Sequence, residues 1–370
     1  MIYLDYNATT PIDPGVAESM RPFIEEHFGN PSSGHPIGHT ARVAIERARA
    51  SVASLIGGSP EEIVFTSGGT EASNWAIRGV AESLESRGRH IVTSNVEHPA
   101  TLKPIESLAR RGFTKTAVAV DGTGQFDPDE IRRAIQPDTI LISVLHAQNE
   151  VGTIEPVAEV GRIAREAGVL FHVDAAQSIG KVPVNVEAFH ADLVSIAGHK
   201  LYGPKGIGAL YVRKGVELPP LIEGAHQEGD RRAGTENVIM AVGLGRAAEL
   251  ASSHLPDEPL QALREYFWDG LSSAVGDRVM QNGHPTERLP GTLNVSFPGY
   301  VGGELLARLD GVCASTGAAC HAGDAKPSAV LTAMGFDRER SVGAIRFSVG
   351  RPTTRGEVEA VVSMLEGVLR

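Results

Sequence analysis

Short apolar runs alternate with helical patterns along the first two thirds of the chain. The runs that predict strands are residues 63–66, 90–93, 115–120, 139–145, 169–173, 192–196 and 208–212. Between most of them, apolar residues recur at the spacing of three and four that is typical of an amphipathic helix. This alternation predicts an α/β fold with an open, mostly parallel seven-stranded sheet flanked by helices. In such a sheet, ligands bind at the carboxyl ends of the strands.

Two helices are predicted before the first of these strands. Asp13 stands before a proline as an N-cap residue does, and the helix that it opens should bend at Pro22 and end at Gly29. A loop over residues 30–38 follows. Apolar positions from Ala41 onward then predict a second helix, which ends at a pair of glycines.

The last third of the chain predicts a second, smaller α+β domain. A helix over residues 235–254 ends before a proline-rich stretch, which is the expected domain boundary. Beyond it we expect helices to about residue 275, at 303–309 and at 355–369, and strands at 292–297 and 345–349. We therefore assign residues 16–256 to a large domain, and residues 1–15 and 257–370 to a small one.

Composition and charge disfavour several classes of protein. The 370 residues are 42% hydrophobic and 21% charged, which is ordinary for a globular protein. With 34 basic and 45 acidic residues the net charge is −11, which disfavours binding to nucleic-acid phosphates. The start of the chain does not resemble a signal peptide, and no apolar stretch reaches the roughly 18 residues of a membrane span. We expect a cytoplasmic protein with neither a membrane nor a nucleic-acid partner.

The cysteines and histidines give little support for a disulfide framework or a metal site. The two cysteines, Cys313 and Cys320, are too few for such a framework, but one of them is a candidate reactive thiol. His35 and His39 have the i, i+4 spacing of metal ligands, yet they lie among prolines and glycines in a predicted loop. We expect no metal.

One lysine lies between a strand-like run and a glycine-rich loop. Residues 192–196 precede Lys200, and glycines stand at positions 198, 203, 206 and 208. A lysine is usually a surface residue, but these glycines let the backbone approach a ligand closely. A desolvated lysine amine has a lowered pKa and becomes nucleophilic. We therefore interpret Lys200 as the covalent anchor of a cofactor, held through a Schiff base.

Further polar residues lie beside expected strand ends. Gly69 and Thr70 follow a strand and open a helix, a pattern typical of either a phosphate cradle or an ordinary helix cap. Asp174 ends an apolar strand, where it either caps a helix or pairs with a cationic group such as a protonated pyridine nitrogen. Asn149 is either a turn former or a ligand donor, and His98 is either a loop residue or an aromatic face for a ring.

The order of these motifs resembles that of the cysteine desulfurases, which are fold-type I enzymes that use pyridoxal 5'-phosphate (PLP). The resemblance covers nearly the whole chain. Its motifs are residues 4–11 (LDYNATTP), 29–32, 66–71, 97–98, 149–152, 172–178, 198–208, 232–237 and 346–350. It implies that the fold is that of a fold-type I PLP-dependent transferase.

The resemblance also implies how the cofactor is held. Lys200 forms the internal aldimine, Asp174 pairs with the pyridine nitrogen, His98 stacks on the ring, Gln177 donates to the phenolic oxygen, and Gly69, Thr70 and His199 hold the phosphate. A threonine from the partner subunit, matching Thr235, completes the phosphate site, so a homodimer is implied. Arg346 matches the arginine that binds the substrate carboxylate, with Asn149 nearby.

Cys320 matches the nucleophilic cysteine on a mobile loop of this family. As a thiolate it attacks the substrate sulfur and holds it as a persulfide for a protein sulfur acceptor or scaffold. A lone small cysteine is more often a core residue, but the glycine and alanines around Cys320 favour exposure. Cys313 lies between Val312 and Ala314 and is expected in the core.

Three departures from the family pattern leave the substrate and the dimer contacts open. Ala197 stands where many members have a serine that contacts phosphate, and residues 224–226 replace a glycine triplet near the dimer contacts. Ala197 and the Ala-Ala-Cys-His run at 318–321 resemble the related selenocysteine lyases. We expect conversion of L-cysteine to L-alanine and a persulfide. The alternatives are an L-selenocysteine lyase, another PLP carbon–sulfur lyase, or a catalytically silent sulfur-transfer partner, although the retained chemistry-bearing residues argue against the last.

Overall fold

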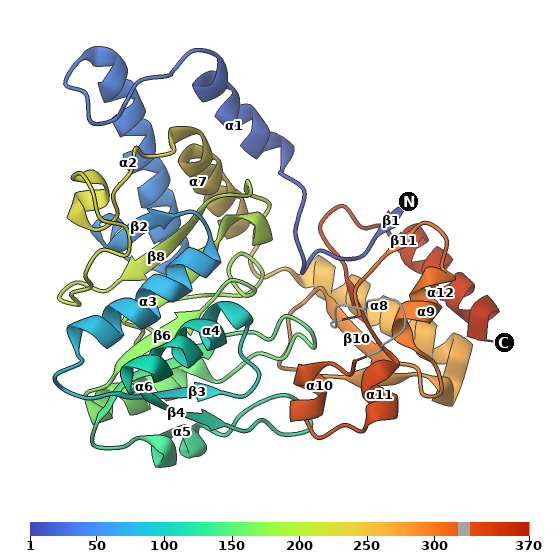
Figure 1. The fold of residues 1–370 in the computed structure, drawn as a ribbon. Coiled ribbons are helices and arrows are strands. Elements are labelled where there is room, and N and C mark those ends of the chain that lie inside the picture. The colour runs from blue at the N-terminus through green and yellow to red at the C-terminus, as the bar shows by residue number, and fades with distance from the viewer. Residues whose placement is uncertain (317–325, 370) are drawn as a thin grey trace.

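A seven-stranded sheet forms the centre of the larger part of the molecule (Figure 1). The computed structural model describes residues 1–316 and 326–369. The strands of this sheet are β2 (Ile63–Thr66), β3 (His90–Ser94), β4 (Thr114–Val118), β5 (Thr139–Leu145), β6 (Leu170–Asp174), β7 (Leu193–Ala197) and β8 (Gly208–Val212). Their order is β2-β8-β7-β6-β5-β3-β4; β8 runs antiparallel to both neighbours, and the other neighbouring pairs are parallel. The predicted α/β fold with a mostly parallel sheet is confirmed.

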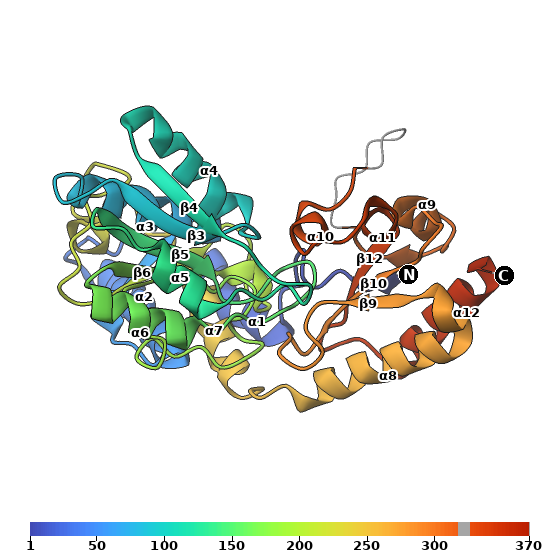
Figure 2. The ribbon, with the colours of Figure 1, turned by 90° about the horizontal axis from the view of Figure 1, so that it is seen from below.

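Helices cover both faces of this sheet. They are α2 (Pro36–Ile56), α3 (Gly69–Ser83), α4 (Pro99–Leu108), α5 (Pro128–Ala134), α6 (Val157–Ala167) and α7 (Val238–Ser252), with α1 (Pro14–Glu25) packed against α7. Figure 2 shows α3 and α4 on one side and α2, α6 and α7 on the other. Successive residues of β2 follow this division: Val64 packs with Trp75 of α3, and Phe65 packs into the cluster that contains Ile56 of α2.

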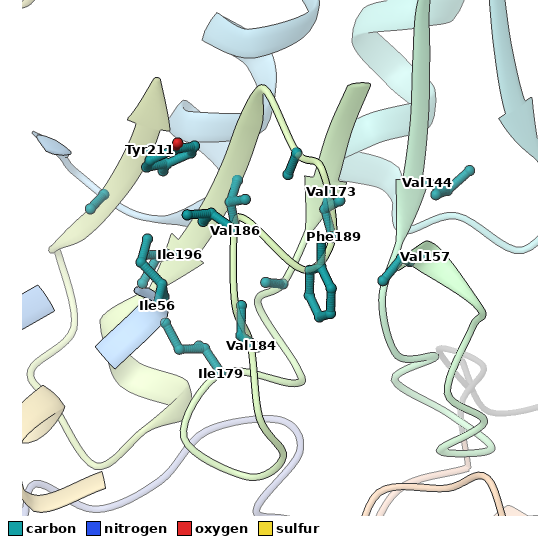
Figure 3. Close-up of a cluster of buried hydrophobic side chains, with 14 of the residues drawn as sticks. Ile56, Val144, Val157, Val173, Ile179, Val184, Val186, Phe189, Ile196 and Tyr211 are labelled. Carbon is teal, nitrogen blue, oxygen red and sulfur yellow. The ribbon is translucent and has the colours of Figure 1, made fainter. Parts of the chain in front are cut away.

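The apolar core on the α2 side shows to which face of the sheet the side chains at the strand ends point. Figure 3 shows Val173 of β6, Ile196 of β7 and Tyr211 of β8 in this cluster, together with Ile56 and Phe189. Successive residues of a strand point to opposite faces. Because Val173 is buried on the α2 side, Asp174 points to the face on which α3 begins.

A second apolar core lies in the smaller part of the molecule. There β9 (Met280–Asn282), β10 (Thr292–Ser296) and β12 (Ala344–Ser348) form an antiparallel sheet in the order β12-β10-β9. The long helices α8 (Glu258–Val275) and α12 (Arg355–Leu369) pack against each other. Phe267 of α8 lies with its ring centroid 5.2 Å from that of Phe347 of β12. The short helices here are α9 (Gly302–Ala307), α10 (Ala329–Ala333) and α11 (Arg338–Val342).

The N-terminal segment joins this second core before it crosses to the larger part (Figure 1). β1 (Ile2–Tyr3) pairs in parallel with β11 (Val312–Cys313), and Leu4 is buried in the same cluster as Phe347. In contrast, Val330 and Leu331 of α10 pack into the core of the larger part. The division into residues 16–256 and residues 1–15 with 257–370 stays a proposal, which the two apolar cores support and from which α10 departs.

Two predicted helix ends differ from the structure for local reasons. Asp13 caps α1 as predicted, accepting a hydrogen bond from the Gly15 amide at 2.8 Å. The helix ends at Glu25 rather than at Gly29, because the amides of residues 26 and 27 turn back to the carbonyl of Pro22. Helix α2 begins at Pro36, inside the predicted loop, because the ring of His35 accepts from the Gly38 amide and serves as the cap.

Within residues 1–316 and 326–369, none of the helices has the length and apolar character needed to cross a membrane.

Candidate active site

A pocket of about 310 Å³ opens at the carboxyl ends of β5, β6 and β7 and at the start of α3. Eight of the candidate residues line it: Gly69, Thr70, His98, Asn149, Asp174, Gln177, His199 and Lys200. Arg346 and Thr235 are not among its lining residues, and Cys320 lies outside the described residues. The structure thus brings eight candidates together at one cavity, while their roles there stay predictions.

Lys200 follows β7 in a short 3-10 turn, Gly198–Lys200, which carries its amine into the pocket. The amine donates to the backbone carbonyl of Asn7 and, at 2.9 Å, to that of Ala8. Burial and, to a smaller extent, Arg346 lower the pKa of Lys200 to about 8 against the opposing effects of Asp5 and Asp174. Lys200 is therefore a lysine whose neutral form is accessible near neutral pH.

Asp174 supplies a buried carboxylate to the same pocket. It is 7% exposed, and Oδ1 accepts from the amide of Ala176 at 3.0 Å. Burial raises the pKa of Asp174, and this hydrogen bond, His98 and Lys200 oppose the rise. A buried carboxylate that faces a cavity favours a cationic partner there.

His98, which the sequence left as either a loop residue or an aromatic face for a ring, also caps a helix. Its Nδ1 accepts from the amide of Ala100 at 3.1 Å, so the ring caps α4, whose first residue is Pro99. In a neutral ring the proton then lies on Nε2. Burial lowers the pKa of His98, with an opposing effect of Asp174, so the neutral ring is favoured.

The start of α3 forms a cradle for an anion. In the part of the chain that the structure describes, no side chain caps this helix at Gly68, so its first amides are available to a ligand. The backbone of Gly208 lies against this turn, and a Cβ there would come within 2.7 Å of the Gly68 backbone. His199 also lines the cradle; burial lowers its pKa to about 4, and its Nδ1 lies 3.1 Å from the Thr9 hydroxyl.

Gln177 belongs to a hydrogen-bond network whose other members the sequence reasoning did not single out. Its Nε2 donates to the carbonyl of Asn7 at 2.9 Å, and its Oε1 accepts from the amine of Lys181 at 2.8 Å. Lys181 also donates to Oδ1 of Asn7 at 3.0 Å. The only sequence signal for Lys181 is its position four residues after Gln177.

Arg346 lies in β12 and contacts Asn149, which lines the pocket. Its Nη1 donates to the Asn149 carbonyl at 2.8 Å, and its Nη2 lies 2.6 Å from Oδ1 of Asp5. Among the described residues, its Nε has no hydrogen-bond partner. The backbone of Ser315, five residues before Cys320, pairs with Arg346, so the chain that leads to Cys320 is attached to this strand. Cys313, expected in the core, is half-buried in β11.

Thr235 is exposed and borders a separate depression of about 240 Å³. Ser67, Gly206 and Ile207 line both this depression and the outer mouth of the phosphate cradle. Thr235 therefore lies beside the cradle of its own chain but does not line the pocket.

Among the described residues, no group of histidine, cysteine and acidic side chains is arranged to hold a metal ion.

The groups in the pocket fit PLP. The uncapped start of α3 suits a phosphate, the buried carboxylate of Asp174 suits a protonated ring nitrogen, and the amine of Lys200 suits an aldehyde. Ala197 faces this cradle with a methyl group in place of a hydroxyl, and its Cβ lies 3.2 Å from where a Cβ at Gly69 would stand. Compared with the family pattern, this cradle therefore lacks one hydroxyl group.

Comparisons with known proteins agree with this chemistry. A family model described as aminotransferase class-V matches residues 2–361. The protein named cysteine desulfurase IscS of Dictyoglomus turgidum is 48% identical over 372 residues, covering 100% of this chain and 94% of that protein. The protein of the same name from Methanosarcina thermophila is 46% identical, covering 100% of this chain and 92% of that protein.

Two solved structures extend the similarity to three dimensions. One, described as a NifS-like protein, has a TM-score of 0.93 at 40% identity, covering 100% of this chain and 99% of that one. Another, described as SspA in complex with cysteine, has a TM-score of 0.85 at 36% identity, covering 94% of this chain and 99% of that one.

Proposed function

The chain belongs to the class-V aminotransferase family, which is PLP-dependent, and we propose that it is a cysteine desulfurase that converts L-cysteine to L-alanine. The observation that carries the proposal is that Lys200, Asp174 and the first turn of α3 line one pocket. When bound, PLP supplies an electron-withdrawing ring that accepts the charge left at the substrate Cα after its proton is removed.

Lys200 anchors the cofactor and moves the proton at the substrate Cα. A pKa of about 8 leaves roughly a tenth of its amine unprotonated at pH 7 and half at pH 8, and this proton transfer requires the unprotonated form. Asp174 holds the ring nitrogen in its protonated form, and the neutral ring of His98 covers one face. The amides of Gly69 and Thr70, with His199, hold the phosphate.

Arg346 and Asn149 bind the substrate. The planar guanidinium of Arg346 suits a carboxylate, and its contact with the Asn149 carbonyl fixes its position beside the pocket. Its contact with Asp5 means that a substrate carboxylate shares or replaces that partner.

Cys320 receives the sulfur. Its thiolate attacks the sulfur of the substrate; an S–S bond forms and the Cβ–S bond breaks. The electron pair of that bond stays with the carbon fragment, which takes up a proton and leaves as L-alanine. The sulfur remains on Cys320 as a persulfide, from which a protein sulfur acceptor or scaffold takes it.

The functional unit is a homodimer in the cytoplasm, in which Thr235 reaches the phosphate of the partner subunit. Two observations support this arrangement: Thr235 is exposed, and it lies outside the pocket of its own chain. The segment that carries it is tied to α3, since Arg232 Nε lies 2.9 Å from Oε1 of Glu71.

L-selenocysteine is the second candidate substrate. The methyl group of Ala197 in the phosphate cradle and the sequence of residues 318–321 favour it. A carbon–selenium bond breaks more readily than a carbon–sulfur bond, so the same pocket serves both substrates.

The test is alanine release from L-cysteine and L-selenocysteine, measured in parallel on the purified protein with PLP. The wild type should bind PLP, seen as an absorbance band, and release alanine. Lys200→Ala should release none while keeping its circular dichroism spectrum, and Lys103→Met, a change at a solvent-facing lysine of α4, should behave as the wild type. Steady alanine production by Lys200→Ala would contradict the assignment, and a silent wild type would favour the non-enzyme alternative.

A further inference from the structure

Lys181 is a half-buried lysine beside the pocket for which the proposed chemistry has no role. Its amine has two hydrogen-bond acceptors, Oε1 of Gln177 at 2.8 Å and Oδ1 of Asn7 at 3.0 Å. Neither is a carboxylate, and among the described residues Lys181 forms no ion pair. A lysine with neutral acceptors and no counter-ion calls for an explanation.

These two contacts help to orient both amide groups. Because Oε1 of Gln177 faces Lys181, the NH₂ group of Gln177 faces the Asn7 carbonyl, to which it donates at 2.9 Å, and retains a second hydrogen for the pocket. Because Oδ1 of Asn7 also faces Lys181, the NH₂ group of Asn7 faces Thr292 at 2.8 Å and the Asn149 carbonyl at 3.2 Å. With Lys181 removed, each amide oxygen loses this donor, and each amide is held only by the contacts of its NH₂ group.

We infer that Lys181 is a positioning residue: its amine holds Gln177 with an N–H donor toward the bound cofactor and holds Asn7 beneath Lys200 and Asn149. The inference rests on the proposed function only for the identity of the group in the pocket. Asn7 extends the effect, since its backbone carbonyl accepts from both Gln177 and Lys200.

The charges around Lys181 favour an uncharged amine. Burial lowers the pKa of Lys181 well below its usual value, and Lys200 and Arg346 lower it further. Asp5 and Asp174 lie close enough to affect Lys200, but neither is among the groups that shift Lys181. A neutral amine has two hydrogens, which match the two acceptors. A charged amine would have a third hydrogen with no acceptor among the described residues, and it would lie near two cationic residues.

The test uses Lys181→Met, Lys181→Gln and Lys181→Arg, with Lys103→Met as the matched control. PLP affinity is measured by titrating the PLP-free protein, without substrate. Lys181→Met should weaken PLP binding about tenfold, since the hydrogen bond to Gln177 and the one to Asn7 are both lost. In a Gln177→Ala background, Lys181→Met should weaken PLP binding by less than about threefold. The contact between Lys181 and Gln177 is already absent there, so it cannot be lost a second time. Lys181→Gln keeps one donor and should fall between the wild type and Lys181→Met.

The charge state of the Lys181 amine is inferred from the pH midpoint at which the absorbance band of bound PLP shifts. Lys181→Arg places a fixed positive charge beside Lys200 and should lower that pH by about one unit, while Lys181→Met should stay close to the wild type. If Lys181 were charged, Lys181→Arg would match the wild type and Lys181→Met would titrate at a higher pH.

Several outcomes would overturn the inference. If Lys181→Met and Lys181→Gln bind PLP as tightly as the control, or if the loss is equally large in the Gln177→Ala background, Lys181 does not act through Gln177. A variant that loses the circular dichroism spectrum of the PLP-free protein would assign Lys181 to the fold instead. A wild type that fails to take up PLP would refute the proposed function and, with it, this role.

Discussion

Asp5 places its carboxylate oxygen Oδ1 2.6 Å from Nη2 of Arg346, so the N-terminal segment holds the arginine that is proposed to bind the substrate. The guanidinium is 6% exposed and the carboxylate side chain 22% exposed. A charge-assisted contact of this kind fixes a planar guanidinium in one orientation. It also places a negative charge close enough to Lys200 to raise its pKa.

We predict that Asp5→Asn lowers the pKa of the Lys200 amine below its present value of about 8. Asp5 raises this pKa, so its removal leaves burial and Arg346 less opposed, and the expected shift is about 0.5 to 1 pH unit. Because the neutral amine reacts with the aldehyde of PLP, the pH midpoint for the rate of PLP uptake by the PLP-free protein should move down.

The control is Asp277→Asn, an exposed carboxylate in a different part of the chain, which should leave the midpoint unchanged. An unchanged or raised midpoint for Asp5→Asn would mean that Asp5 affects Arg346 alone.

Glu97, which precedes His98, leads to a prediction about stability and pH. Its Oε1 accepts from the Ser94 hydroxyl at 2.6 Å and from the Leu145 amide at 3.1 Å, while among the described residues its Oε2 has no partner. Burial raises the pKa of Glu97 to about 8, with a smaller contribution from Asp174. The folded protein therefore holds a proton on Glu97 that the unfolded chain releases above about pH 4.5.

The sign of this effect is that stability falls as the pH rises. Between about pH 4.5 and pH 8 the folded state binds more protons than the unfolded state, so the free energy of unfolding decreases by up to a few kcal/mol. Glu97→Gln resembles the protonated acid and should flatten this slope and raise the thermal midpoint at pH 8.5. Glu18→Gln, on the exposed face of α1, is the control. A slope that persists in Glu97→Gln would assign the effect to another buried group, such as Glu155.

The sequence predicted those parts of the site that follow from strand ends. Lys200 and Asp174 each follow an apolar run, and ligands in open α/β sheets bind at such ends. Lys181 could not be found in this way, because it contacts Asn7 across 174 residues, and that contact exists only because the N-terminal segment crosses from one core to the other. The pairing of Asp5 with Arg346 depends on the same crossing.

Two histidines cap helices whose starts the sequence analysis did not predict. His35 and His98 each precede a proline, and each accepts a hydrogen bond from a first-turn amide through Nδ1. Proline at the first position of a helix is a recognised start signal. Histidine is not a usual cap, so the starts of α2 and α4 were read as loops. The three-residue strand β9 is short and mostly polar, which leaves no periodicity to detect.

We predict that Thr235→Ala weakens PLP binding through the partner subunit. The expected loss is about tenfold to 150-fold, as for one hydrogen bond to a charged group of about 1.5 to 3 kcal/mol. Mixed dimers of a Thr235→Ala chain with a Lys200→Ala chain show whether Thr235 acts in the partner's site or in the site of its own chain. The chain with an intact Lys200 receives an intact Thr235 from its partner, so one site per dimer should regain wild-type affinity. If that site stays weak, Thr235 acts within its own chain, and a purely monomeric protein would exclude the shared site altogether.

The last prediction distinguishes the two substrates through Cys320. Cysteine needs a nucleophile, because its carbon–sulfur bond is broken by attack of a thiolate on the sulfur. A selenol is more acidic and leaves from carbon more readily, so selenium can depart without a cysteine to receive it. We therefore expect Cys320→Ala to lose essentially all alanine release from L-cysteine and to keep a substantial part of that from L-selenocysteine. Cys313→Ala, in β11, is the matched control and should leave both activities nearly intact. Equal loss on both substrates, with PLP still bound, would mean that Cys320 does more than accept the chalcogen, since an acceptor alone is dispensable when the leaving group departs unaided.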